Sequence, residues 1–586
     1  MNLFLKVKRV YTNYPLALTI SFVLIVLFLL ALQGFDVVDE GWYMTFYQQF
    51  YNHPETVEYN FAFYLTGIIG GLWYELFPTG GILSFRILAM LCMVSTFVVS
   101  YKILSKYMPK NYAIIGLLMI LFVNDFGYVA FYYNQLSAFF AVLIIYFLLK
   151  GINEKHKLSL LIAGGLTAIN VFSRLPNITL FAFSLVFPIQ LLWTKSIKAK
   201  YWLNQLLVYG CGVVIGFGII YMVLVALGHT HIMHNAILGI LDKGQNTGSN
   251  HNFSKLLLVY IKEYGLIIKS FLKLIIVFAI LSSIGKVLSG ASKFIGYILG
   301  VILFACVFRI NAIYSLYALG IIGCLSLLFL NKVKPNYKTL CLLALIMMLF
   351  LPLGSDGGIH NAGYVCVWLA FPIFFYAIEF INDAFFNLEA NNFSLRKMKL
   401  LSVVPYMIVG FFILKAYNIS YEAYFDKGSR IYKVFSVKND LAKGIYTTKE
   451  RAQIFNELLS ELEKYISRDD YLLAYDKIPM VNFLTQTKPY MYISWVWVYD
   501  GVMFKKQLHR AEEEIGVLPV VVQQKFETIG TFSEPVLDYL SEEKEESYRY
   551  NKGRVIAMND FLRRNHYEIV WSNPYFNIYK PKISNY

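Results

Sequence analysis

Three carboxylates stand close together near the N-terminus, in a segment rich in aromatic side chains. They are Asp36, Asp39 and Glu40, and Trp42 and Tyr43 follow directly. Aromatic faces stack on sugar rings, and the surroundings of a partly buried carboxylate tune its pKa. Such a group suits a general base that deprotonates an acceptor hydroxyl. The same composition also fits an acidic loop that only helps to set the topology of a membrane protein.

Three arginines are candidates for holding an anionic group. Arg86, Arg174 and Arg309 each stand within a turn or two of the end of an apolar segment. A guanidinium can bind a phosphate through two parallel hydrogen bonds, and it stays charged when partly buried. Because charge inside a membrane is costly, an arginine there is a functional candidate by default. The alternative is that each side chain reaches out to lipid headgroups. Three loop lysines fit a solvated face better and are weaker candidates: Lys243, Lys255 and Lys262.

A polar, glycine-rich stretch from Leu353 to Asn361 offers further contacts. Its glycines let the backbone approach a ligand, and Asp356, His360 and Asn361 can bind hydroxyls or a phosphate. A tight hairpin between two helices would use the same residues for structure alone. The stretch is not a nucleotide-binding P-loop, because no Gly-Lys-Ser/Thr follows it.

The sequence gives no strong signal for a metal or another cofactor. The six cysteines all fall in apolar segments, and their spacing fits neither a disulfide framework nor a metal site. One region holds several histidines and an acid, but loop histidines without a tight constellation are more often bystanders. These residues are His229, His231, His234, Asp242 and His251. We therefore expect no cofactor; a divalent metal is compatible with the chemistry but is not indicated.

The body that must position these residues is expected to span a membrane. Of the 586 residues, 58% are hydrophobic and only 15% are charged, whereas soluble chains carry about 25% charged residues. Disorder needs the opposite balance and is excluded. A spanning helix needs about 20 apolar residues, and such runs recur up to residue 417. We place about thirteen spans, near 15–33, 83–104, 111–123, 129–149, 158–173, 178–194, 203–228, 264–284, 294–310, 312–330, 339–353, 363–382 and 400–417.

The charges predict which side each loop faces. With the N-terminus in the cytoplasm, the cytoplasmic segments contain 20 basic and three acidic residues. The first exterior loop, residues 34–82, has no Lys or Arg and six acids. This is the positive-inside pattern, so the net charge of +15 reports topology and not nucleic-acid binding. An odd number of spans places the C-terminal part outside.

Residues 418–586 form a second region with a different composition. They contain 23 basic and 23 acidic residues and no spanning run. Thr447 and Glu450 have the spacing of a capping box that opens a helix to about Ile466. Short strands are predicted at 471–475, 517–522 and 568–571, with a helix near 559–565. The predicted fold is thus an all-α polytopic membrane bundle over 1–417, followed by a soluble α/β domain over 418–586.

The first loop resembles the start of the GT-C membrane glycosyltransferases. In that family a first span is followed at once by an Asp-Glu pair with Tyr and Trp. The protein O-mannosyltransferases and the lipid A aminoarabinose transferase are the most similar in pattern. The likeness continues, in the same order along the chain, through four further segments: Trp73–Pro78 with Ser84–Arg86, Gly444–Arg451, Tyr475–Pro479 and Phe483–Thr485. One departure is Asn134-Gln135, where some relatives carry an Asp.

This resemblance implies an enzyme that takes a sugar from a polyprenyl-phosphate donor. Asp39 would be the catalytic base and Glu40 its partner, with Asp36 as a rival for the base. Trp42 and Tyr43 would line the substrate site, while Arg86, Arg174 and Arg309 would hold the leaving phosphate. The acceptor would be a lipid, a glycan or a protein on the exterior face of a bacterial inner or plasma membrane. No Trp-Trp-Asp tripeptide is present, which disfavours en bloc oligosaccharide transfer.

Two other classes of protein stay open. A secondary transporter or lipid flippase would have inverted repeats and charged or broken helices near the middle of the membrane. Here the ionisable residues gather at one face instead, and Glu379 is the nearest exception. A non-catalytic envelope protein would bind a partner through its exterior domain, and Asp39 would be dispensable.

Overall fold

The protein is described by a computed structural model. It covers residues 14–123, 129–194, 199–245, 252–287, 291–309, 312–355, 357–386, 400–421, 423, 425–527, 534–547 and 549–582.

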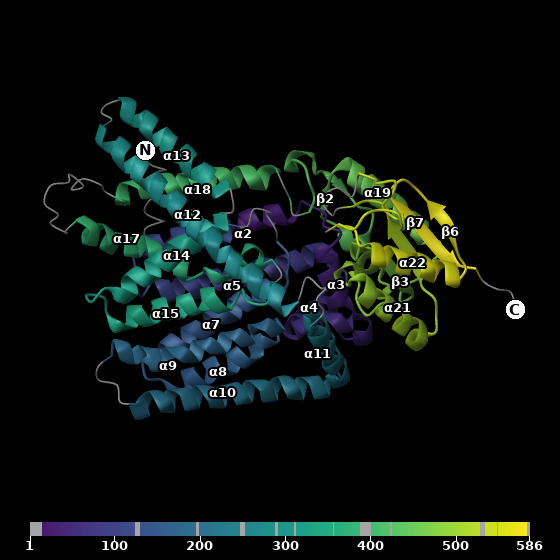
Figure 1. Ribbon diagram of the computed structural model, residues 1–586, viewed down its shortest axis with the longest axis horizontal. Helices are drawn as coiled ribbons and strands as arrows, with labels where there is room; N and C mark the ends of the chain where they lie inside the picture. Colours follow the sequence, from purple (N-terminus) through teal and green to yellow (C-terminus); the bar gives the residue numbers. More distant parts are fainter. Residues whose placement is uncertain are drawn as a thin grey trace.

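The body of the molecule is a bundle of apolar helices that run along its longest axis (Figure 1). Within the described residues, seven helical stretches are long and apolar enough to cross a membrane. They lie in α5 (Gly81–Leu104), α7 (Tyr133–Asn153), the stretch Leu175–Leu192 that includes η2 and α9, α10 (Ala199–Ala226), α12 (Phe253–Val287), α14 (Ala312–Phe329) and α18 (Leu400–Tyr421). Helices α16 (Gly358–Cys366) and α17 (Ala370–Phe386), bent by 73°, make an eighth if they form one broken span.

Shorter apolar helices complete the bundle. They are α2 (Pro15–Ala31), α6 (Lys110–Leu121), α8 (Lys157–Val171), α13 (Ala291–Arg309) and α15 (Pro335–Phe350). Large apolar side chains are exposed on the outside of the bundle, such as Val214 and Met222 on α10. Such surfaces fit lipid and not water. The structure thus describes a multi-pass membrane protein, and the count of about thirteen spans stays a prediction.

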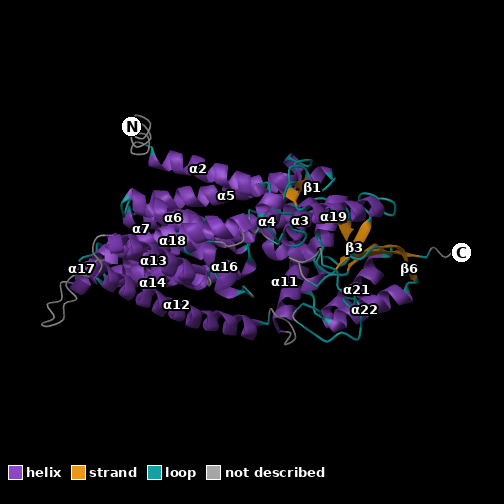
Figure 2. Ribbon diagram, turned by 90° about the horizontal axis from the view of Figure 1, so that it is seen from above, coloured by secondary structure: helices purple, strands orange, loops and turns teal. Residues whose placement is uncertain are grey.

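Four short helices lie between the bundle and the C-terminal region (Figures 1 and 2). Three belong to the first loop: α3 (Asp39–Gln49), η1 (Pro54–Phe63) and α4 (Tyr64–Leu76). The fourth, α11 (Thr230–Gln245), packs against η1. The predicted acidic loop is therefore a folded layer, and its helix α3 carries the candidate residues.

The C-terminal region contains a five-stranded sheet with the strand order β4-β3-β5-β7-β6. The strands are β3 (Tyr471–Tyr475), β4 (Lys488–Pro489), β5 (Val520–Gln524), β6 (Tyr567–Ser572) and β7 (Phe576–Pro581). Strand β3 pairs in parallel with β4 and β5, while β7 pairs antiparallel with β5 and β6. The helices of this region are α19 (Lys449–Leu462), α20 (Met480–Thr485), α21 (Gly501–Ile515) and α22 (Lys552–Arg564). A two-stranded sheet of β1 (Phe435–Ser436) and β2 (Tyr446–Thr447) precedes them.

The predicted α/β character of this region is confirmed, with several local corrections. The helix predicted near 559–565 is α22, which begins at Lys552, and the helix predicted to end at about Ile466 is α19, which ends at Leu462. Strand β5 begins at Val520, three residues after the predicted start. Helix α19 is capped by Thr448, whose side chain accepts the N–H of Arg451, and not by Thr447. The Thr447 hydroxyl instead donates to Asp426 at 2.7 Å, because Thr447 belongs to β2 and faces the interior.

Candidate active site

Asp36 holds the turn that leads into α3. Its two carboxylate oxygens accept the backbone N–H groups of Val38 and Glu40, at 2.8 and 2.9 Å. The side chain is buried. Burial raises the pKa of the Asp36 carboxyl well above its ordinary value, and the charges of Asp39 and Glu40 add to the rise. Asp36 therefore caps the start of α3, a structural task that its position in the sequence did not distinguish from catalysis.

Glu40 and Arg86 form a buried ion pair between α3 and α5. Arg86 donates from Nε to Oε1 at 2.7 Å and from Nη2 to Oε2 at 2.5 Å. The same guanidinium donates to the carbonyls of Ala31 and Gly34, at 2.6 and 2.8 Å. Arg86 thus forms with the Glu40 carboxylate the two parallel hydrogen bonds that were expected with a phosphate. Both residues fix the end of α2 and the start of α3 against α5.

Asp39 is placed differently from the other two acids. It is the first residue of α3 and is only half-buried. A helix N-terminus favours negative charge through its free N–H groups and its dipole. The charge of Asp39 acts on the Tyr132 hydroxyl. Asp39 therefore lies close to Tyr132, at the start of α7.

Polar groups of α7 meet at the Tyr132 hydroxyl. The side chains of Asn134 and Gln135 lie within hydrogen-bonding reach of this hydroxyl, which also forms a hydrogen bond with the hydroxyl of Tyr364. The Oε1 atom of Gln135 is buried and has no hydrogen-bond partner among the described residues. A buried acceptor of this kind is rare in native proteins and calls for a partner such as water or a ligand. Asn134 and Gln135 thus lie at the candidate site, and both carry amide side chains.

Trp42 and Tyr43 belong to a packed aromatic cluster. The Tyr43 ring stacks on Tyr132, with centroids 5.3 Å apart, and meets Tyr133 edge-on at 6.0 Å. Trp42 packs against Trp495 of the C-terminal region at 5.3 Å. Both Trp42 and Tyr43 are buried. Their rings are therefore packed against neighbouring aromatic side chains, and their role toward a sugar stays a prediction.

Arg174 contacts the same cluster through Tyr133. Its guanidinium carbon lies 5.9 Å from the centroid of the Tyr133 ring. Nη2 donates to the carbonyls of Leu351 and Leu353, at 2.6 and 2.9 Å, and Nε donates to Asn177 at 3.3 Å. Arg174 therefore joins the start of the glycine-rich stretch to the aromatic cluster around Asp39. Arg309, by contrast, is exposed at the end of α13.

The glycine-rich stretch leads into α16, whose N-terminus is occupied by a carboxylate. Glu263 of α12 is buried and accepts the backbone N–H groups of Ile359 and His360, the latter at 3.1 Å. The Tyr314 hydroxyl donates to the same carboxylate at 2.8 Å. Glu263 thus fills the place where an anionic ligand would bind a helix N-terminus. Sequence reasoning missed it, although a lone acid in an apolar run is a recognisable signal.

The remaining candidates have separate positions. The side chains of His360 and Asn361 are exposed on the first turn of α16, and Asp356 lies outside the described residues. His229 is buried among the rings of Phe50 and Phe61, and burial lowers its pKa. His251 lies outside the described residues. Within the described residues, no three His, Cys, Asp or Glu side chains are grouped as metal ligands.

The C-terminal region packs directly on α3 through α20. Four hydrogen bonds join the two segments: Met480 N–H to Val37 O at 3.1 Å, Thr45 Oγ1 to Pro479 O at 3.2 Å, Gln48 Nε2 to Phe483 O at 3.3 Å and Gln49 Nε2 to Thr487 O at 3.3 Å. The approach is so close that a Cβ on Gly41 would lie 2.2 Å from the Met480 nitrogen. The segments 475–479 and 483–485, singled out in the sequence, thus support the helix that carries Asp39.

A buried carboxylate, Asp426, fixes the turn before α3 from the other side. It accepts the Phe35 N–H at 2.9 Å and the Thr447 hydroxyl at 2.7 Å. Lys433 and Arg451 approach the same carboxylate at 3.3 and 3.4 Å. Sequence reasoning missed Asp426, because the turn that it holds lies 391 residues away in the chain and no local pattern marks it.

A second junction lies at the rim of the first loop. Arg510 of α21 donates to both oxygens of Glu58, at 2.8 and 3.1 Å. Asn235 of α11 donates to Glu58 at 3.1 Å, and Lys243 donates to the Tyr59 hydroxyl at 2.7 Å. The first loop, α11 and the C-terminal region are therefore joined into one layer around α3.

Comparisons with known proteins give distant likenesses. No protein-family model matches the sequence, and no curated protein matches it. Among solved structures, the chain is similar to the oligosaccharyltransferase of Archaeoglobus fulgidus, with 14% identity and a TM-score of 0.47 over 88% of this chain and 69% of the other. It is also similar to ArnT from Cupriavidus metallidurans, with 12% identity and a TM-score of 0.42 over 97% of this chain and 98% of the other.

Proposed function

We propose that this protein is a membrane glycosyltransferase that moves a single sugar from a polyprenyl-phosphate donor to an acceptor hydroxyl, with Asp39 as the general base. The observation that carries the proposal is that three neighbouring acids have different surroundings. Asp36 caps α3 and Glu40 binds Arg86, whereas Asp39 is half-buried beside a cluster of polar and aromatic groups. A base must reach its substrate, and Asp39 is the acid of the three that meets this condition.

The proposed step is a direct displacement at the anomeric carbon. Asp39 takes the proton of the acceptor hydroxyl, and the hydroxyl oxygen forms a bond to the anomeric carbon. The bond between that carbon and the phosphate oxygen breaks, and the polyprenyl phosphate leaves with the electron pair. A phosphate is a better leaving group than an alcohol, so one carboxylate base suffices and no cofactor enters the step. Positioning supplies much of the rate in such a reaction.

Three groups near Asp39 are assigned to the substrates. The buried Oε1 of Gln135 would accept a sugar hydroxyl, which would give this atom a hydrogen bond. The Tyr132 hydroxyl would bind the same sugar. Arg174, which lies over the Tyr133 ring, is the cation proposed to face the leaving phosphate. We assign Arg86 to structure, because its guanidinium forms a buried bidentate ion pair with the Glu40 carboxylate.

The proposed orientation of the protein in the membrane follows from the charge pattern. We place the N-terminus in the cytoplasm of a bacterial cell, and Asp39 and the C-terminal region on the exterior face. The acceptor, whether lipid, glycan or protein, would reach Asp39 from that face, and the donor would arrive through the bilayer.

The test uses purified protein in lipid nanodiscs with radiolabelled polyprenyl-phosphate sugars. Transfer is compared among the wild type, Asp39→Asn and Glu55→Gln, an equally conservative change at an exposed acid of the same loop. We expect Asp39→Asn to lose about 100-fold or more and Glu55→Gln to stay active. Full transfer by Asp39→Asn would overturn the assignment of the base. Absence of transfer by the wild type with every donor would overturn the enzyme proposal.

One observation favours a second candidate, a secondary transporter or lipid flippase. Helices α16 and α17 are bent by 73° at a break, and the buried Glu263 lies at the N-terminus of α16. Broken helices with an ionisable group at a half-helix end are typical of transporters. Uptake or lipid-flipping assays in proteoliposomes distinguish the two candidates. If the protein is a transporter, we expect transport that is lost in Glu263→Gln and kept in Asp39→Asn. If it is the proposed enzyme, we expect sugar transfer that is lost in Asp39→Asn and kept in Glu263→Gln.

A further inference from the structure

The segment that follows α18 is held at the level where two membrane helices end. Arg430 donates from Nε to the Ile419 carbonyl of α18 at 2.6 Å, and from Nη1 to the Leu30 carbonyl of α2 at 3.3 Å. Gln33 donates in return to the carbonyls of Arg430 and Lys433, at 2.9 and 3.2 Å. These contacts fix residues 430–433 beside the ends of both helices, so the segment cannot drift away from the bilayer surface.

This segment exposes apolar side chains in succession. The exposed fractions are 81% for Ile431, 70% for Tyr432, 61% for Val434 and 42% for Phe435. Lys433, between them, is turned inward and buried, with its Nζ 2.9 Å from the Lys427 carbonyl and 2.8 Å from the Gly428 carbonyl. In water such a row of exposed apolar groups is unfavourable. At the boundary of a bilayer, aromatic and aliphatic side chains are favoured. We name Ile431–Phe435 the apolar segment.

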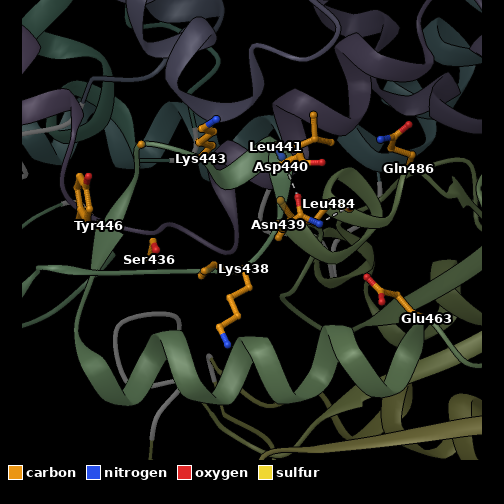
Figure 3. A pocket seen from close by; sticks show the side chains of 12 residues that line it. Ser436, Lys438, Asn439, Asp440, Leu441, Lys443, Tyr446, Glu463, Leu484 and Gln486 are labelled. Atoms are coloured by element: carbon orange, nitrogen blue, oxygen red, sulfur yellow. Dashed lines mark hydrogen bonds between the residues drawn. The ribbon is translucent and has the colours of Figure 1, made fainter.

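A polar cavity of about 660 Å³ begins directly after the apolar segment (Figure 3). Its wall includes Lys438, Asn439, Asp440, Lys443 and Glu463. The Leu441 carbonyl, in the same wall, is in close contact with the start of α5, because a Cβ on Gly81 would lie 2.0 Å from it. The cavity therefore lies at the same level as the end of a third membrane helix.

The charges around the cavity are of both signs. Lys438 and Lys443 are exposed cations, and Asp440 and Glu463 are exposed anions. In Figure 3, Glu463 stands at the end of α19, and Lys438 lies over the same helix. A simple anion would be attracted by the lysines and repelled by the carboxylates. A headgroup that contains both a phosphate and an ammonium matches both pairs of charges, since lysine binds phosphate and carboxylate binds ammonium.

We propose that residues 431–446 bind a zwitterionic membrane phospholipid. Its headgroup occupies the polar cavity, and its acyl chains lie along the apolar segment. The C-terminal region is thereby attached to the bilayer at a place separate from Asp39, and the proposal is independent of the chemistry proposed there.

The first experiment measures whether the apolar segment enters the bilayer. The full chain is reconstituted in nanodiscs that contain lipids brominated near the headgroup end of the acyl chain. The fluorescence of Tyr432→Trp is compared with that of Val502→Trp, an equally exposed position on α21, after subtraction of the signal from the eight native tryptophans. We expect bromine to quench the added fluorescence of Tyr432→Trp and to leave that of Val502→Trp unchanged. Equal quenching of the two, or none, would overturn the proposal.

The second experiment identifies the headgroup. Thermal unfolding of the detergent-solubilised protein is followed with short-chain phosphatidylethanolamine, short-chain phosphatidylglycerol or inorganic phosphate. We expect the largest rise in the unfolding midpoint with phosphatidylethanolamine, and we expect Lys438→Gln and Glu463→Gln each to reduce that rise. Both side chains are exposed, so the variants are expected to fold. An equal effect of phosphatidylglycerol or of phosphate, or an unchanged rise in both variants, would contradict the assignment.

Discussion

Glu40 and Arg86 are 46 residues apart in the chain, yet they pair through both carboxylate oxygens at the buried junction of α3 and α5. Because Arg86 also binds the last carbonyl of α2 and the Gly34 carbonyl, this one guanidinium connects three helices. The pair leaves Asp39, the preceding residue, at a fixed place beside Tyr132.

Replacing Arg86 tests the structural role of this pair. Removing one partner of a buried ion pair leaves a charge without compensation, which costs about 3–5 kcal/mol. We expect Arg86→Ala to lower the stability of the purified protein by that amount in denaturant unfolding, with a smaller loss for Arg86→Lys. Arg309→Ala, at an exposed arginine, is the matched control and should change stability little. If Arg86→Ala were as stable as the wild type while transfer was lost, Arg86 would belong to the substrate site.

The close contact between Gly41 and Met480 gives a test of how α3 is supported. Gly41→Ala places a methyl group 2.2 Å from the Met480 nitrogen, so α20 and α3 must move apart. A shift of about 1 Å at a reactive group costs about 100-fold in rate. We expect sugar transfer to fall by that order while the protein stays folded. Gly239→Ala on α11 is the control, because nothing lies within 4 Å of its Cβ position. Normal transfer by Gly41→Ala would mean that the C-terminal region does not position Asp39.

Asp426 should be among the most sensitive positions of the chain. Its carboxylate is buried and compensates Lys433 and Arg451, while it holds the Phe35 N–H. Asp426→Ala leaves two buried cations without their partner, and we expect a loss of about 3–5 kcal/mol in unfolding. Thr447→Val removes one hydrogen bond to the same carboxylate and should cost about 1 kcal/mol. The half-exposed Asp560 offers a control, since Asp560→Ala should be near neutral. Equal effects of the Asp426 and Asp560 changes would rule out this role.

A buried lysine in the C-terminal region predicts a dependence of stability on pH. Burial lowers the pKa of Lys477 to about 8, whereas an unfolded lysine titrates near 10.4. Between these values the unfolded chain binds more protons than the folded chain, so stability rises with pH in this window. Below pH 8 Lys477 is protonated in both states, so the free-energy cost of burying its charge no longer changes with pH.

The size of this effect is about 3 kcal/mol between pH 8 and pH 10.5. We expect Lys477→Met to remove this part of the rise in unfolding free energy, whatever its effect on stability at pH 7. Lys505→Met, at an exposed lysine of α21, should keep the wild-type slope. If the unfolding free energies of the wild type and Lys477→Met changed in parallel with pH, the pKa of Lys477 would not be lowered by folding.

Sequence patterns predicted those parts of the molecule that depend on local order. The apolar runs marked the membrane body, and the run Tyr471–Tyr475 marked β3 with its exact ends. The strand at Phe576–Pro581 escaped notice because Asn577 and Pro581 are typical of turns. The cap of α19 was displaced by one residue because Thr447 and Thr448 are chemically equivalent, and only β2 pairing decides between them.

The site could be predicted as a set of residues but not as a set of roles. The sequence singled out the first loop as the candidate segment, yet nothing local separates Asp36 and Glu40 from Asp39. Their roles depend on Arg86 and on the turn geometry, which are properties of the folded chain. Asp426 and Glu263 could not be ranked for the same reason, since the backbone N–H groups of Phe35 and Ile359 that they accept lie 391 and 96 residues away.

The contacts between α3 and the segment around α20 can form only late in synthesis of the chain. Gln49 bonds the carbonyl of Thr487, 438 residues later in the chain, and synthesis at 5–20 residues per second takes on the order of 20 to 90 seconds to cover that length. During this interval the helix that carries Asp39 has been made but its support has not. The nascent protein therefore passes through a stage in which α3 lacks these contacts. The position of α3 is therefore completed only after the C-terminal region has been made, and a chain stalled before that point would lack the contacts with α20.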